Sequence, residues 1–337
     1  MKNTLEYHVP NLTEGLSPVR RHALSEITIE YTVDWLSRIV GQVLPAALAE
    51  SFARNGTAIF TSYCWPDTLP DRLRTLSVMN AFAFFADDMG SNAYGDVIGA
   101  EATRSWVIEY IYACMGERRK LTTPWGKETA DAWEELASFE PAATSALMRK
   151  EWLTWMATYA PAPPQEFSEA DRYANAGGPV TLPMTAFCLG LDVSAPMKDR
   201  AFRQAAKDAT LLSILINDVI SLGGEVINKD ESRNAIIMTM RDRQITLQQA
   251  VDLVCDRIAR LRNRFLSQRI AILSSPVGQL EGAASYLEAF EYVITGVAFY
   301  HATSGRYKFS PNSTWEGSGP AFIKIRDGQV LAVAAPE

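Results

Sequence analysis

The chain has 337 residues, of which 47% are hydrophobic and 21% are charged, so it can bury a large core without disulfides or a structural metal. Its 32 basic and 39 acidic residues give a formal net charge of −7 without a long basic run, which argues against nucleic acid as a partner. The four cysteines form no CxxC pair, and three histidines are too few for a His-rich metal centre. The start of the chain lacks the apolar segment of a secretion signal, and no apolar run predicts a membrane span, so we expect a cytoplasmic protein.

Apolar residues recur at intervals of three and four along most of the chain, which is the spacing of helices that bury one face. The Asp327-Gly328 pair in the tail predicts a β-hairpin. We therefore expect an all-α fold with a single helical domain over 1–337, and apart from that hairpin we leave the structure of the tail, 308–337, open. The predicted helices are 27–52 with a kink at Pro45, 71–86, 103–115, 129–139, 142–159, 183–191, 198–222, 246–273 and 277–302, with a Pro-rich loop at 160–164.

Two adjacent carboxylates, Asp87 and Asp88, follow a run that has no polar side chain after Asn80. Burying such a pair is costly unless a cation or a proton neutralises it, and the helix dipole disfavours acidic side chains at a helix C-terminus. The pair is therefore a candidate metal site. The alternative is a pair of solvated carboxylates at the end of a helix.

A second group of oxygen donors consists of Asn217, Ser221 and Glu225, spaced by four residues. In a helix such positions advance by about 40° per step, so the three side chains form one stripe. Amide, hydroxyl and carboxylate oxygens suit a hard cation such as Mg²⁺. Any one of them could instead bond within its own helix, but the three together with a second acidic site favour metal binding.

The spacing N-D-x-x-S-x-x-x-E over 217–225 resembles the second metal motif of class I terpene synthases. Asp87 and Asp88 resemble the start of the first, aspartate-rich motif of that family. Gly90 and Ser91 stand where a third acidic residue usually falls, and Asp96 is farther along the chain.

Two further segments resemble the family's diphosphate-binding motifs. Arg172 stands where members carry an arginine that senses diphosphate, and the linker and helix-break residues that follow it would be Asn175, in place of the common Asp or Thr, and Ala176. Arg306 and Tyr307 resemble the C-terminal pair that also contacts diphosphate.

The resemblance implies a class I terpenoid synthase helical bundle with a central active-site cavity. The substrate would be a linear isoprenoid diphosphate and the cofactor Mg²⁺, with three ions per site. The implied roles are metal binding by Asp87, Asp88, Asn217, Ser221 and Glu225, and diphosphate binding by Arg172, Arg306 and Tyr307. Catalysis would depend on Asp87, Asp88, Arg172, Asn217 and Glu225.

The cavity lining is inferred partly from helical phase. Phe84 lies one turn before Asp87 and Asn80 one turn earlier, so both should face the cavity. Aromatic faces there would stabilise a carbocation. Further candidates for the lining are Phe85, Trp65, Asn175, Ala176 and Tyr300, the last standing where many bacterial members have tryptophan.

The favoured function is cyclisation of farnesyl diphosphate to a sesquiterpene hydrocarbon or alcohol. The alternatives are a diterpene cyclase that uses geranylgeranyl diphosphate, a trans-prenyl chain-elongating transferase, and a non-catalytic helical binding protein. The asparagine–serine–glutamate form of the second motif favours a cyclase over an elongating enzyme. Whether the chain forms a homodimer is left open.

Overall fold

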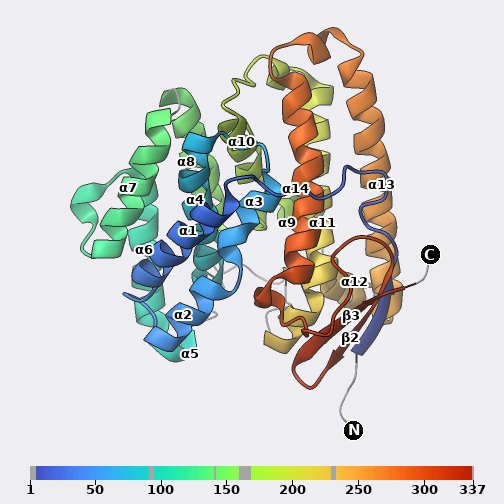
Figure 1. Cartoon of the computed structure of the whole chain (residues 1–337), viewed down its shortest axis with the longest axis horizontal. Helices are drawn as coiled ribbons and strands as arrows, with labels where there is room; N and C mark the ends of the chain where they lie inside the picture. The colour runs from blue at the N-terminus through green and yellow to red at the C-terminus, as the bar shows by residue number, and fades with distance from the viewer. Residues whose placement is uncertain (1–4, 91–94, 140–141, 159–167, 229–232, 336–337) are drawn as a thin grey trace.

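The structure is a computed structural model that describes residues 5–90, 95–139, 142–158, 168–228 and 233–335. Within these residues most of the chain is helical, and one small sheet lies at one end of the molecule (Figure 1). The α-helices are α1 (Ser25–Val40), α2 (Ala46–Arg54), α3 (Phe60–Cys64), α4 (Pro70–Gly90), α5 (Gly95–Ile98), α6 (Ala100–Met115), α7 (Pro124–Phe139), α8 (Ala142–Ala157), α9 (Glu169–Asn175), α10 (Gly178–Leu189), α11 (Arg200–Asn228), α12 (Ala235–Arg243), α13 (Leu247–Leu273) and α14 (Ala283–Thr303). Short 3₁₀ helices are η1 (Thr57–Ile59), η2 (Arg118–Lys120), η3 (Pro196–Lys198), η5 (Pro276–Gln279) and η6 (Gly305–Tyr307), and the strands are β1 (Leu5–Val9), β2 (Ala321–Arg326) and β3 (Gln329–Ala334).

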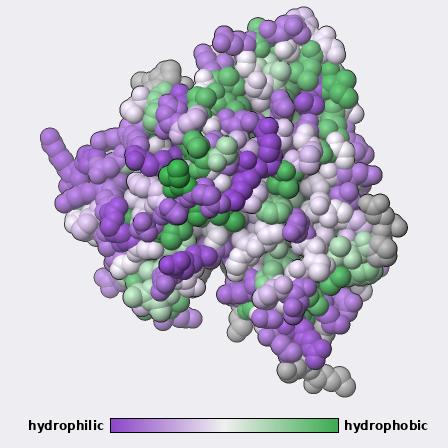
Figure 2. Space-filling view, in the orientation of Figure 1, coloured by the Kyte–Doolittle hydropathy of each residue, from purple (hydrophilic) through white to green (hydrophobic). Residues whose placement is uncertain are grey.

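The helices form two neighbouring groups, one around α4 and one around α11. Helix α4 packs against α1, α3, α6 and α7, whereas α11 packs against α13, α14 and α12. Helix α10 contacts both central helices, and α14 also packs against α3, so the groups are joined along their length. Figure 1 shows α1 to α8 on one side and α11, α13 and α14 on the other. In the space-filling view the lower outline of the molecule is indented between the half that carries α2 and the half that carries β2 and β3 (Figure 2).

Helix α11 is a long, largely buried helix at the centre of its group. By length and hydropathy it is the one described helix that could cross a membrane, but 78% of its most apolar window is buried inside the protein. Its buried positions run almost without a break from Ala205 to Gly224. Such a helix is apolar because it is surrounded by protein.

Helix α4 lies in the middle of the other group, as its apolar circumference predicts. On one face Phe82 packs its ring against Trp35 and Trp106, and on another face Phe84 packs against Phe60. The helix extends to Gly90, so Asp87 and Asp88 lie in its last turn.

The predicted helices are largely confirmed, although several of their ends differ, as in α11, which continues past the predicted end at 222 to Asn228. The predicted helix 27–52 is two helices, because α1 ends at Val40 and Pro45 is the N-cap of α2 rather than a kink. The last predicted helix begins later than expected, since 277 lies in η5 and α14 starts after Gly282, which has a positive φ of 75°. The Pro-rich stretch 160–164 and Ser91 lie outside the described residues.

The all-α fold class is confirmed, and one small three-stranded sheet accompanies the helices. The tail forms the predicted hairpin, with Asp327 and Gly328 at φ values of 51° and 77°, as a tight two-residue turn requires. Strand β1, which the sequence analysis did not predict, pairs antiparallel with β2, from Leu5 opposite Ile325 to Val9 opposite Ala321. The two ends of the described chain therefore meet in one sheet.

Two consecutive glycines in α11 allow the C-terminal segment to approach this helix closely. A Cβ on Gly224 would lie 2.7 Å from the carbonyl oxygen of Tyr307, and one on Gly223 would lie 2.7 Å from the side chain of Val330. The segment after η6 is itself bonded to β3, because the Val330 amide donates to the carbonyl of Lys308 at 2.9 Å. The glycine pair thus seats η6 and the hairpin against α11.

We predict that Gly224→Ala destabilises the protein by about 1–3 kcal/mol, because the added methyl group meets backbone atoms that cannot move independently. Thermal unfolding measures this loss. The matched control is Gly305→Ala in η6, where the nearest atom would be 3.8 Å away. Equal stability of the two variants would show that the close contact of α11 with Tyr307 does not exist in solution.

Candidate active site

The stripe of oxygen donors on α11 is present. The hydroxyl of Ser221 donates to Oε1 of Glu225 at 2.5 Å, as expected for residues four apart on one helix face. Asn217 lies one turn earlier and is partly buried. Its side chain makes no hydrogen bond to any residue that the structure describes, so its amide remains available to a ligand.

Glu225 accepts two hydrogen bonds but forms no ion pair within 5–90, 95–139, 142–158, 168–228 and 233–335. Its second oxygen, Oε2, accepts a hydrogen bond from the amide of Asn234 at 2.9 Å. Burial, and then the negative charge of Asp218, raise the pKa of Glu225 to about 7, although the bonds from Ser221 and Asn234 and the charge of Arg172 act in the opposite direction. A cation beside Glu225 would stabilise its charged form.

Asp218, next to Asn217, forms a buried ion pair with Arg172. Its side chain is completely inaccessible, and the Nε of Arg172 donates to Oδ2 at 2.9 Å while Nη2 donates to Oδ1 at 2.5 Å. Arg172 also donates from Nη1 to Oδ1 of Asn175 at 2.8 Å. Burial alone would lower the pKa of Arg172, but the charges of Asp218, Glu225 and Asp87 raise it above its ordinary value.

The second arginine joins the end of α4 to η6. Arg306 donates to both carboxylate oxygens of Asp88, at 3.0 Å from Nη1 and 2.5 Å from Nη2, and its Nη2 lies 3.9 Å from Oδ2 of Asp87. Its guanidinium carbon lies over two rings, 5.0 Å from the centroid of Phe84 and 5.8 Å from that of Tyr307. Asp87 is half exposed, whereas Asp88 and Arg306 are largely buried.

Groups from both acidic motifs act on the same side chains. Burial raises the pKa of Tyr307, Arg306 lowers it, and the charges of Glu225 and Asp87 raise it further. Asp87 and Glu225 also both raise the pKa of Arg172. Arg306 in η6 pairs with Asp88 at the end of α4, and the adjacent Tyr307 lies against Gly224 of α11, so the ends of α4 and α11 lie at one site.

Aromatic rings gather beside Arg306. The ring of Phe60 makes edge contacts with Phe84 and Tyr300, each with centroids 5.0 Å apart. His301 stacks on Tyr307 at 4.8 Å, and its Nδ1 lies 2.7 Å from the carbonyl oxygen of Val297. Burial, outweighing the bond to Val297, lowers the pKa of His301 to about 3, so this ring is neutral at pH 7.

Other predicted cavity residues lie in the interior of the fold. Asn80 is buried and donates its amide to the hydroxyl of Thr61 at 2.9 Å, which ties α4 to α3. Phe85 is completely buried and packs its edge against Phe52 and Trp106. The phase of Phe85 on α4 therefore directs its ring into the core, away from the ring of Phe84.

The remaining predicted positions lie near α10. Trp65 is buried, donates from Nε1 to the hydroxyl of Thr185 at 3.0 Å, and contacts the ring of Phe60. The predicted helix break is present, because α9 ends at Asn175 and Ala176 is its C-cap. The carbonyl of Asn175 accepts a hydrogen bond from Nε1 of Trp155 at 3.0 Å.

Several residues at the site were missed by the sequence analysis. Asp218 directly follows Asn217 of the metal motif, but the sequence did not indicate that its side chain pairs with Arg172. Asn234 and Phe60 lie in segments with no motif, and their roles depend on contacts between elements. No local pattern could have indicated either residue.

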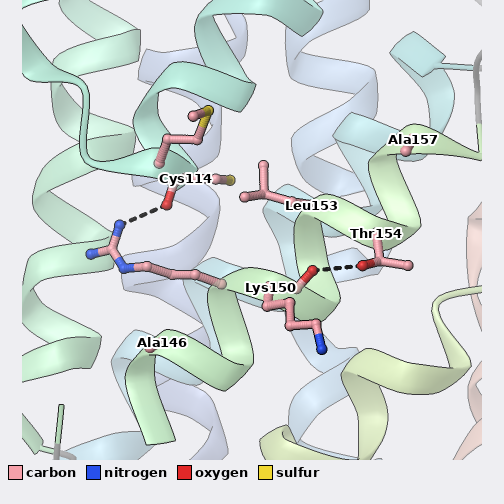
Figure 3. A pocket seen from close by; sticks show the side chains of 8 residues that line it. Cys114, Ala146, Lys150, Leu153, Thr154 and Ala157 are labelled. Atoms are coloured by element: carbon pink, nitrogen blue, oxygen red, sulfur yellow. Dashed lines mark hydrogen bonds between the residues drawn. The ribbon is translucent and has the colours of Figure 1, made fainter. Parts of the chain in front are cut away.

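Other ligand sites are not evident among the described residues. The described residues, those of the two acidic motifs included, bring no three His, Cys, Asp or Glu side chains together as a group that could hold a metal, and the four cysteines are buried and free. A surface pocket of about 590 Å³ lies between α6 and α8, where Arg149 donates to the carbonyl of Cys114 at 2.7 Å (Figure 3). It is lined by none of the predicted site residues.

Comparison with known families agrees with this geometry. Residues 79–264, more than half of the chain, match the family model described as terpene synthase family 2, C-terminal metal binding. The chain belongs to this family. The matched segment contains the acidic end of α4, Arg172 and the stripe on α11, so the resemblance found in the sequence is confirmed.

Members of known function are distant in sequence and longer than this chain. Talaropentaene synthase from Talaromyces verruculosus is 26% identical over 320 residues, which cover 89% of this chain and 45% of that protein. The bifunctional sesterterpene synthase astC from Talaromyces wortmannii is 22% identical, over 84% of this chain and 38% of its own length. The chain thus spans less than half the length of these relatives.

Solved terpene synthases share the fold. Hedycaryol synthase in complex with HEPES aligns with a TM-score of 0.70 at 18% identity, covering 90% of this chain and 99% of the other. A variant of cucumene synthase aligns with a TM-score of 0.69 at 16% identity, covering 86% and 99% of the two chains. These likenesses show that the chain has the class I terpene synthase helical fold.

We predict that Glu225→Gln stabilises the metal-free protein, and more so as the pH rises. In the unfolded chain the carboxyl titrates near 4.5, but in the folded chain its pKa is about 7. Between these values the folded state keeps a proton that the unfolded state loses, so stability falls as the pH rises across this window. Glutamine removes that loss, and we expect a melting temperature about 3 °C above the unaltered chain at pH 8 but little change at pH 4.5.

Thermal unfolding with a chelator present measures this difference. Glu288→Gln on the exposed face of α14 is the control for loss of one negative charge. A difference that stays constant from pH 4.5 to 8 would contradict the raised pKa of Glu225.

Proposed function

We propose that the chain is a magnesium-dependent cyclase that ionises a linear isoprenoid diphosphate and closes the resulting carbocation into one or more rings. One observation carries this proposal: Arg306 and Tyr307 join Asp88 of the first acidic motif to Gly224, the neighbour of Glu225 in the second, next to a group of aromatic rings. The family's metal-binding domain supports the same assignment.

The donor set fits Mg²⁺. Asn217 has an amide oxygen without a protein partner among the described residues, and Ser221 and Glu225 add a hydroxyl and a carboxylate on the same stripe. Asp87 and Asp88 supply carboxylates from the facing helix. These oxygens are the ligands that Mg²⁺ prefers, and when bound it supplies positive charge that stabilises a departing diphosphate. We propose three such ions per site, as the resemblance implies.

The two arginines and Tyr307 would bind the diphosphate. Each guanidinium already makes a two-pronged contact with a carboxylate, Arg172 with Asp218 and Arg306 with Asp88, which is the geometry that also fits phosphate oxygens. The raised pKa of Tyr307 keeps its hydroxyl protonated, so it can donate a hydrogen bond to the leaving group.

The rings beside the arginines would protect and stabilise the carbocation. Phe84, Phe60 and Tyr300 present aromatic faces and edges without a strong nucleophile. Because His301 is neutral at pH 7, it adds no positive charge to repel a cation. Tyr300 and His301 are buried and Phe60 and Phe84 are partly buried, so a bound substrate that covers these rings would exclude water that could quench the cation.

The proposal also specifies the length of the isoprenoid chain of the substrate. We propose farnesyl diphosphate as the first substrate, giving a sesquiterpene. A longer diphosphate is the second candidate, since one relative carries the name sesterterpene synthase and would therefore form a product of 25 carbons. The geranylgeranyl compound lies between these two lengths.

We predict that incubation of the chain with Mg²⁺ and farnesyl diphosphate releases pyrophosphate and gives a cyclic product, detected by gas chromatography and mass spectrometry. Parallel reactions contain the C10, C20 and C25 diphosphates, each with and without isopentenyl diphosphate. Asn217→Ala should lower turnover on the order of 100-fold by removing a cation ligand, whereas Lys207→Ala on the exposed side of α11 should not.

The outcomes separate the alternatives. A cyclic product from the C20 or C25 substrate alone would replace farnesyl diphosphate as the substrate. Chain growth with isopentenyl diphosphate would indicate an elongating transferase. No pyrophosphate release from any substrate would leave a non-catalytic helical binding protein.

We predict that Phe84→Leu changes the product mixture more than the rate of pyrophosphate release, because its ring lies beside Arg306 and the other aromatic groups. The control is Phe82→Leu on the same helix, whose ring packs against Trp35 and Trp106. Product ratios that stay unchanged in Phe84→Leu would place this ring outside the region where the cation rearranges.

A further inference from the structure

We infer that Asn234 is a positioning residue for the cation site: its side-chain amide fixes the Glu225 carboxylate for metal binding. This inference rests on the proposed function and adds a residue that lies outside the recognised motifs. Asn234 is 1% exposed and is the N-cap of α12.

The side chain of Asn234 uses all of its polar groups. Its amide nitrogen donates to the carbonyl oxygen of Asp218 at 2.8 Å and to Oε2 of Glu225 at 2.9 Å. Its oxygen accepts from the backbone N–H of Ile236 at 2.9 Å. These three partners fix the orientation of the amide. If its nitrogen and oxygen changed places, the oxygen would face two acceptors and the nitrogen would face a donor.

These bonds hold Glu225 from the side opposite Ser221. Ser221 donates to Oε1 and Asn234 to Oε2, so both ends of the carboxylate are fixed. Each carboxylate oxygen has two lone pairs, and one bond to a protein donor leaves the other lone pair available to a cation. Partners of this kind orient metal ligands, and their loss costs about 10–100-fold in metal affinity.

The start of α12 also contacts the ion pair that Asp218 forms with Arg172. The backbone N–H of Ala235 donates to Oδ2 of Asp218 at 3.1 Å, and Asp218 in turn holds Arg172. Asn234 and its neighbour therefore connect the cation ligand on α11 to the side chain proposed to bind diphosphate. Through the carbonyl of Asp218, the same amide also fixes the backbone of α11 two turns before Glu225.

The capping and positioning roles of Asn234 can be separated. Serine is as good an N-cap as asparagine, so Asn234→Ser keeps the bond to the start of α12. Its shorter side chain, however, cannot span the distance to Glu225 and Asp218. The matched control is Thr246→Ser at the N-cap of α13, where the cap bonds to the backbone of Gln249 and no site residue is involved.

The test is isothermal titration of the full-length chain with inorganic pyrophosphate at a series of Mg²⁺ concentrations. For Asn234→Ser we expect the Mg²⁺ concentration needed for half-maximal affinity to rise by about 10-fold or more. At saturating Mg²⁺ the pyrophosphate affinity should return to that of the unaltered chain. A merely structural role would instead lower the affinity equally at every Mg²⁺ concentration.

An unchanged Mg²⁺ dependence in Asn234→Ser, or a loss that saturating Mg²⁺ does not restore, would overturn the inference. If this variant is thermally unstable, the same titration with Asn234→Thr, which also keeps a cap, decides the question. The unaltered chain tests the proposed function separately. If it binds no pyrophosphate with Mg²⁺, the proposed function fails, and this inference with it.

Discussion

Negative charge placed beside an apolar helical bundle has to be compensated, and the way this chain compensates it determines the arrangement of the site. Asp218 has no solvent contact and is stabilised by the two-pronged pair with Arg172. Asp88 is stabilised in the same way by Arg306. Glu225 receives hydrogen bonds but forms no such ion pair with the residues that the structure describes, and burial raises its pKa. Among the described carboxylates of the site, the end of the stripe on α11 is therefore the place where a cation would add the missing positive charge.

The C-terminal segment and β1 help to bring the charged side chains of the site together. Arg306 reaches Asp88 on α4 from η6, whose Tyr307 approaches α11 closely at Gly224, while Gly223 allows the hairpin to approach the same helix. The hairpin that follows bonds to the same segment, and β1 adds the hydroxyl of Tyr7, which donates to the carbonyl of Val219 at 3.1 Å. Strands from both ends of the described chain thus support the C-terminal side of the site.

The sequence was sufficient for features that depend on local periodicity. The stripe of Ser221 and Glu225 follows from a four-residue spacing, and the position of Phe84 beside the site follows from its helical phase relative to Asp87. The resemblance to the family motifs indicated the other residues of the site, Arg172, Arg306 and Tyr307.

Features that depend on contacts between distant elements could not be predicted in this way. Phe85 follows Phe84 by one residue and therefore points to another face of α4, but that this face belongs to the core depends on the packing of α2 and α6 against it. Asn234 becomes part of the site because α12 folds back onto α11, and β1 exists because the hairpin offers it an edge. Neither relation leaves a periodic signal in the sequence.

The most direct measurement of the central claim is a crystal structure of the chain grown with pyrophosphate and Mn²⁺ in place of Mg²⁺, with anomalous scattering used to locate the metal. The account predicts anomalous peaks beside Asp87 and beside Glu225, with one pyrophosphate between them in contact with Arg172 and Arg306. Metal peaks confined to one of the two motifs, or pyrophosphate bound elsewhere on the surface, would contradict it.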